Sequence, residues 1–75
     1  MFFHSFIEAV ENGVSMSLID MVDVVFKFPD GKTETYTLNK NDVYGNTPIY
    51  QEIVKIATQN DGVLATVKAR SDNGN

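Results

Sequence analysis

Apolar side chains near the start of the chain recur at helical spacing. Four of them share one face of an α-helix, at positions i, i+3, i+4 and i+7: Phe3, Phe6, Ile7 and Val10. Asn12 and Gly13 follow and are typical of a helix end, so the sequence predicts a short amphipathic helix that stops there. Ser5 and Glu8 have the spacing of a capping box, and that alternative would shorten the helix to about two turns.

Residues 14–21, VSMSLIDM, fit two patterns. Met16 and Leu18 alternate with serine, as they would in a strand. A helical turn would instead be lined by Leu18, Ile19, Met21 and Val22. We expect an extended segment that leads into the next strand and is broken near Asp20.

The stretch VVFKFPDGKTETYTL, residues 24–38, has the pattern of a β-hairpin. Pro29 and Asp30 suit the central positions of a type I turn, and Gly31 suits the left-handed residue that completes a three-residue loop. Such a loop pairs Phe28 with Lys32. A two-residue loop centred on Asp30 and Gly31 would shift the register by one residue and set the apolar strand against threonines.

The three-residue loop therefore decides which face of the hairpin is buried. We expect five side chains to point inward: Val22, Val24, Phe26, Tyr36 and Leu38. The opposite face then carries three threonines, one valine and two charged residues: Thr33, Thr35, Thr37, Val25, Asp23 and Lys27.

The second half of the chain predicts a loop, a helix and a strand. NKNDVYG, residues 39–45, is polar and rich in turn residues. Thr47 suits a helix N-cap with Pro48 at the first helical position, and residues 60–62 end that helix. Its apolar stripe is Ile49, Ile53, Ile56 and Ala57, flanked by Tyr50 and Val54. Residues 63–70, VLATVKAR, alternate as in a half-buried strand whose Val and Ala residues point inward.

These elements predict a single α+β domain over residues 1–70, followed by a disordered tail over residues 71–75. The order is helix, strand, strand, helix, strand. Because the second helix brings the chain back, the last strand can pair antiparallel with the first. The expected fold is a three-stranded antiparallel sheet, order 2-1-3, with two helices on one face. Order 1-2-3, with a parallel pair and a right-handed crossover, is the alternative.

Composition argues against several classes of partner. The 75 residues carry ten acidic and six basic side chains, a net charge of −4, with the acids spread along the chain. Nucleic-acid binding depends on clustered Lys and Arg, so it is not expected. The apolar residues of the N-terminal segment are interrupted by Glu8 and Glu11, which predicts neither a signal peptide nor a membrane span. The absence of cysteine is compatible with a reducing compartment, and we expect a soluble, cytoplasmic protein.

The sequence offers little for catalysis, so we expect no enzyme, no cofactor and no metal. His4 is the single histidine, and a nucleophile–base pair or a metal site would need further partners. Two acid pairs, Asp20 with Asp23 and Asp42 with Glu52, suit a solvated surface better than acid–base work. The glycines stand alone and form no phosphate-binding loop. YGNTP, residues 44–48, suits a capped loop better than an anion site at a helix start.

A protein partner is the remaining expectation. The uncovered sheet face is locally basic, because four of the six cations lie on or beside it, and its aromatic residues fall on the other face, unlike RNA-binding sheets. Phe28 with Pro29 at the hairpin tip, and Tyr44 before the second helix, are candidate anchors. The predicted partner-binding residues are Phe28, Pro29, Lys32, Tyr44, Lys27, Thr35, Lys68 and Arg70.

The predicted function is a small soluble acidic protein–protein interaction module, a bacterial or phage-encoded regulator or inhibitor of a host protein. The alternative is a self-associating, homodimeric structural or accessory subunit that pairs through a sheet edge or the sheet face. The hairpin with its Pro-Asp-Gly turn, followed by a helix and a strand, resembles the opening of small β-grasp domains of the TGS type. That likeness covers about half the chain and implies no particular function.

Overall fold

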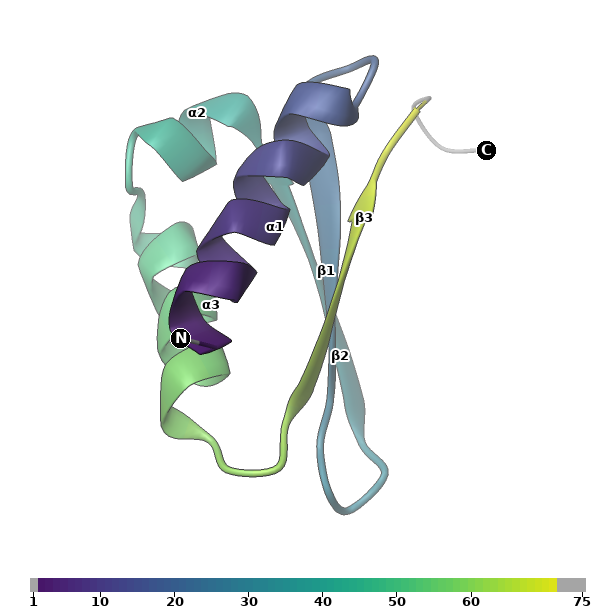
Figure 1. Cartoon of the computed structure of the whole chain (residues 1–75), viewed down its shortest axis with the longest axis vertical. Helices are drawn as coiled ribbons and strands as arrows, with labels where there is room; N and C mark the ends of the chain where they lie inside the picture. The colour runs from purple at the N-terminus through teal and green to yellow at the C-terminus, as the bar shows by residue number, and fades with distance from the viewer. Residues whose placement is uncertain (1, 72–75) are drawn as a thin grey trace.

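The computed structural model describes residues 2–71, with side chains from residue 5 onward. Its elements are α1 (Phe2–Met16), β1 (Met21–Lys27), β2 (Thr33–Asn39), α2 (Lys40–Tyr44), α3 (Pro48–Gln59) and β3 (Leu64–Ala69). The strands form an antiparallel sheet in the order β2-β1-β3, and the helices lie together on one of its faces (Figure 1). The predicted α+β architecture is thereby confirmed. Of the predicted tail, residues 72–75 lie outside the described residues.

The hairpin has the predicted three-residue loop and register. The Phe28 N–H donates to the Lys32 carbonyl at 2.8 Å, and the Gly31 N–H donates to the Phe28 carbonyl at 2.9 Å. Gly31 has φ +94°, a value that glycine adopts without strain. Val24 pairs with Tyr36 and Val25 with Thr35, as the alternation requires.

The core lies between the inner sheet face and the helices. Four strand residues are fully buried: Val22, Val24, Phe26 and Leu38. Phe26 contacts the ring of Phe6 from α1 and the ring of Tyr36 from β2, with centroids 6.2 and 6.0 Å apart. The helices and the loop before β3 add Val10, Val14, Val43, Tyr50, Ile53, Ala57 and Val63. The side chain of Phe3 lies outside the described residues.

The predicted end of the first helix at Gly13 is wrong. The helix continues to Met16 and buries Val14. Gly13 faces the sheet, where an added Cβ would lie 2.8 Å from Val22 Cγ2 and 3.3 Å from Val67 Cγ1. This glycine therefore permits close approach of helix and sheet and does not terminate the helix.

The extended conformation predicted for residues 14–21 is wrong up to residue 20. Residues 14–16 belong to α1, and residues 17–20 form a turn before β1 starts at Met21. The expected break near Asp20 is confirmed, because Asp20 has φ +57°. The helix extends further than predicted because Val14 adds one more turn to its buried face.

The loop predicted over residues 39–45 contains the short helix α2. Asn39 and Asp42 form a capping box: the Asn39 side chain accepts the Asp42 N–H at 2.8 Å, and the Asp42 carboxylate accepts the Asn39 N–H at 3.2 Å. Val43 is buried beneath this turn. The polar composition that suggested a loop is thus a helix start with one apolar anchor.

Helix α3 begins at Pro48, as predicted, but its buried face is rotated. Tyr50, Ile53 and Ala57 are buried, whereas Ile49 is exposed and Ile56 is half-buried. The predicted stripe assumed packing on the sheet alone. Helix α3 also contacts α1 and α2, and Tyr50 lies close enough to α1 for the charge of Glu11 to act on it.

Candidate partner-binding surfaces

The sheet face opposite the helices carries the most distinctive surface of the molecule. We call it the open face, and its outward residues are Met21, Asp23, Val25, Lys27, Thr33, Thr35, Thr37, Asn39, Leu64, Thr66, Lys68 and Arg70. Val25 lies between Thr35 and Thr66 in the register, so a row of two hydroxyls and one aliphatic side chain crosses its centre. Four of the predicted residues meet here: Lys27, Thr35, Lys68 and Arg70.

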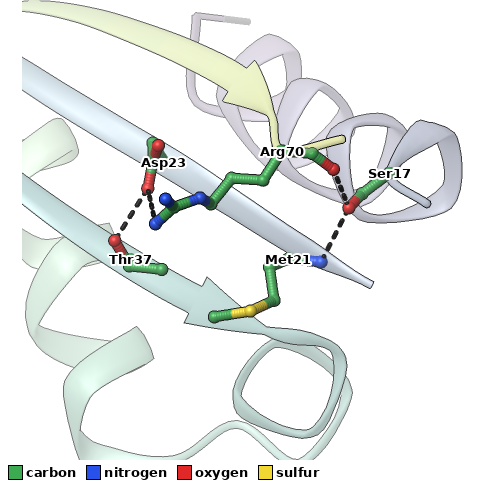
Figure 2. A network of polar contacts seen from close by, with 5 residues as sticks. All are labelled: Ser17, Met21, Asp23, Thr37 and Arg70. Atoms are coloured by element: carbon green, nitrogen blue, oxygen red, sulfur yellow. Dashed lines mark hydrogen bonds and ion pairs between the residues drawn. The ribbon is translucent and has the colours of Figure 1, made fainter. Parts of the chain in front are cut away.

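One end of the open face is a polar cluster around Asp23 (Figure 2). The Thr37 hydroxyl donates to the Asp23 carboxylate at 2.7 Å, and a guanidinium nitrogen of Arg70 lies 3.5 Å from the same oxygen. Arg70 is half-buried and is held by this pair. Lys68 and Lys27 are exposed and make no ion pair with any residue in the described range 5–71. They are the cations that remain available to a partner.

Ser17, the residue after α1, lies at the same end of the sheet. Its buried hydroxyl donates to the Arg70 carbonyl and accepts the Met21 N–H at 3.0 Å, as Figure 2 shows. It also accepts the Ile19 N–H at 3.1 Å. The hydroxyl thus stands in for the last ladder hydrogen bond between β1 and β3. Ser17 was not among the predicted site residues, because a serine in an alternating segment predicts a solvent-facing side chain.

The hairpin tip brings together three further predicted residues. Phe28, Pro29 and Lys32, with Asp30 and Glu34, line a shallow groove of about 360 Å³. Phe28 is half-buried and packs against the core. Pro29 is exposed on one side and lies against the loop before β3, where a Cβ on Gly62 would be 3.0 Å from Pro29 Cγ. Packing within the domain therefore uses part of the apolar surface of this tip.

Tyr44 lies apart from both surfaces. It ends α2 in the helical layer, at the end of the molecule away from the hairpin tip (Figure 1). Its side chain is 60% exposed. The eight predicted residues therefore fall into three places: the open face, the hairpin tip and the end of α2.

Several titratable side chains in the described part of the chain have structural roles. The Asp42 carboxylate caps α2 and also accepts the Thr47 hydroxyl at 3.0 Å. The Tyr36 hydroxyl donates to Glu34 at 2.9 Å, and this bond raises the pKa of Tyr36. Burial, with a smaller contribution from the charge of Glu11, raises the pKa of Tyr50.

The described part of the chain contains no metal-binding cluster, because no three His, Cys, Asp or Glu side chains in it are grouped so that they could hold a metal ion. The side chain of His4 lies outside the described residues. No helix in the described part of the chain has the length and apolar character to cross a bilayer.

Compared with protein-family models, curated proteins and solved structures, the chain shows no significant match. The likeness to TGS-type β-grasp domains stays limited to the hairpin and the helix and strand after it. A functional proposal therefore has to be argued from the residues exposed on the surfaces described above.

Proposed function

We propose that this chain is a protein-binding module that acts by occupying a surface of another protein, as small regulators and inhibitors do. The open face is the observation that supports the proposal. It combines threonine hydroxyls, two cations that form no ion pair within residues 5–71, and Leu64, which is 64% exposed. Such a face offers hydrogen bonds, charge and apolar contact without a catalytic group.

The charge of the open face indicates the chemistry of its partner. Lys27 and Lys68 are positive on a chain whose net charge is −4. A partner with an acidic patch is attracted to this face and repelled by the rest of the molecule, which favours one docking orientation. The lack of cysteine supports a cytoplasmic setting, and the proposed role is that of a bacterial or phage-encoded regulator or inhibitor.

The proposal is tested by capturing the partner from host lysate with matched charge reversals. We expect wild type to retain a specific protein and the double variant Lys27→Glu, Lys68→Glu to lose it. Lys55→Glu, an exposed change on α3, is the control and should retain the partner. If the double variant and the control retain the protein equally, the open face is not the binding surface. Tyr44→Ala tests whether the separate aromatic group contributes.

A self-associating accessory subunit is the second candidate. It is favoured by the two sheet edges, since β2 and β3 each pair only with β1 within residues 2–71. Unpaired edges offer backbone groups to another copy.

A further inference from the structure

The free edge of β3 presents the backbone groups of a defined set of residues. The Arg70 N–H donates to the Met21 carbonyl at 3.0 Å, so Arg70 is directed toward β1. Backbone direction alternates along a strand, so Leu64, Thr66 and Lys68 are also directed toward β1. The N–H and C=O groups of the intervening residues, Ala65, Val67 and Ala69, therefore point away from β1 to the free edge.

A groove runs beside the same edge. Ser5, Phe6 and Ala9 of α1 and Ala65 and Val67 of β3 line it, with a volume of about 210 Å³. Its walls are mostly apolar, and four of its five residues are small or aliphatic. The residues that offer free backbone groups thus also form one wall of a groove suited to small apolar side chains.

The other free edge has a different arrangement. Because the Phe28 N–H bonds to Lys32, the backbone groups of Thr33, Thr35 and Thr37 point to the free side of β2. Their side chains lie on the open face, not toward the helices. Only at β3 do free backbone groups coincide with the α1 groove.

We propose that the β3 edge binds an extended segment of a partner protein as a fourth strand. Strand addition of this kind takes affinity from backbone hydrogen bonds and specificity from pockets for alternate side chains. The inward side chains of the segment are small and apolar and enter the groove beside Ala65 and Val67. Its outward side chains are acidic, because they lie beside the exposed side chain of Lys68.

Charge decides between this partner and a second copy of the chain. A β3–β3 pair that kept the helices of both copies on one side would place the two Lys68 side chains on the same side of the new sheet. An acidic segment neutralises Lys68 instead. The inference rests on the proposed protein-binding function and adds the β3 edge to the open face, with which it shares Lys68.

The test is a blocked peptide of sequence TVEVEVT, added to the whole chain and followed by amide hydrogen exchange in NMR. We expect saturable binding that protects the amides of Ala65 and Val67, while those of Thr33, Thr35 and Thr37 stay unchanged. Peptide TVKVKVT is the charge control and should bind at least about threefold more weakly than TVEVEVT. No protection at Ala65 and Val67, or protection at the β2 edge instead, overturns the proposal.

Two variants sharpen the result. Ala65→Pro removes a free-edge N–H without removing a ladder bond, and it should abolish peptide binding, whereas Thr35→Pro on the other edge should not. Lys68→Glu should weaken TVEVEVT by about threefold and strengthen TVKVKVT, a reversal that needs no proline. Unchanged binding in both Ala65→Pro and Lys68→Glu overturns the proposal.

Two further outcomes are informative. Protection of Ala65 and Val67 that rises with protein concentration without peptide would identify a second copy as the occupant and would also overturn the proposal. The single variant Lys27→Glu reports on the proposed function separately, because Lys27 lies on β1 and not on the β3 edge. If Lys27→Glu loses the partner and no peptide binds at β3, the strand-addition proposal is overturned and the protein-binding proposal stands.

Discussion

Ser17 illustrates how one side chain joins elements that are distant in sequence. Its hydroxyl links the end of α1 to the Met21 N–H of β1 and to the Arg70 carbonyl after β3. Both groups belong to the last rung of the β1–β3 ladder, which has no direct bond in that direction. Buried backbone groups left unpaired cost free energy, so the hydroxyl has a structural role.

We expect Ser17→Ala to lower the free energy of unfolding by about 1–3 kcal/mol, because the Met21 N–H and the Arg70 carbonyl lose their partner. Urea denaturation monitored by circular dichroism measures the change. Ser15→Ala, an exposed site in the last turn of α1, is the matched control and should change stability little. Equal effects at the two serines would contradict the role assigned to Ser17.

Tyr50 predicts a loss of stability at alkaline pH. Its pKa in the folded protein is raised above 10.0 by burial, so the unfolded chain releases this proton more readily. Stability is unaffected by this group below pH 10 and falls as pH rises from there through the folded-state pKa. Denaturation across that range should show a smaller alkaline loss in Tyr50→Phe than in wild type. Identical pH profiles would refute the prediction.

At the scale of elements, the distance between α1 and the sheet is set at Gly13. An alanine there would place its Cβ 2.8 Å from Val22 Cγ2. In an exposed helix interior Gly→Ala stabilises by about 1 kcal/mol. Here we expect Gly13→Ala to destabilise by about 1–3 kcal/mol, since overpacking forces helix and strand apart.

A double-mutant cycle separates this clash from other effects of the substitution. In a Val22→Ala background the clashing methyl group is absent, and Gly13→Ala should cost less. Asn12→Ala, at an exposed neighbour in α1, serves as control and should raise stability by about 0.5 kcal/mol. A stabilising Gly13→Ala would show that the helix does not pack as closely as described.

Helix α2 depends on its capping box. Asp42 accepts the Asn39 N–H and the Thr47 hydroxyl, so it ties the start of α2 to the start of α3. We expect Asp42→Ala to lower the free energy of unfolding by about 1 kcal/mol, as measured by thermal or urea denaturation. Asn41→Ala at the exposed neighbouring position should be nearly neutral, and a similar loss there would argue against a capping effect.

At the scale of the whole molecule, the two free sheet edges raise the question of self-association. The proposed function predicts a monomer by light scattering at both micromolar and millimolar concentration, because the exposed charge of Lys68 disfavours β3–β3 pairing. A dimer that is retained in Lys68→Glu would favour the accessory-subunit alternative.

The sheet was predictable because its signals are local and have a period of two. The Pro29-Asp30-Gly31 turn specifies loop length, loop length specifies register, and register places the valines and threonines on opposite faces. The connection lengths then leave β3 free to pair with β1. The open-face residues Lys27, Thr35 and Lys68 could therefore be placed before the structure was known.

The contacts that join elements were not predictable in this way. Gly13 has the same local sequence whether it ends a helix or lies under a strand, and the difference is made by Val22 and Val67. The local sequence predicts that Ser17 is a surface residue, and only the contact with Arg70, 53 residues away, gives it a buried partner. The rotation of α3, which exposes Ile49, depends on where α1 and α2 lie.

The amino-acid sequence by itself determined the hairpin, the strand alternation and the start of α3. Periodicity and turn chemistry act between near neighbours, so these features need no knowledge of the rest of the chain. The tertiary structure alone decided how far α1 extends, which serine completes the sheet, and which backbone groups of β3 stay free beside a groove. Those features arise where residues distant in sequence meet, and their geometry exists only once the chain has packed.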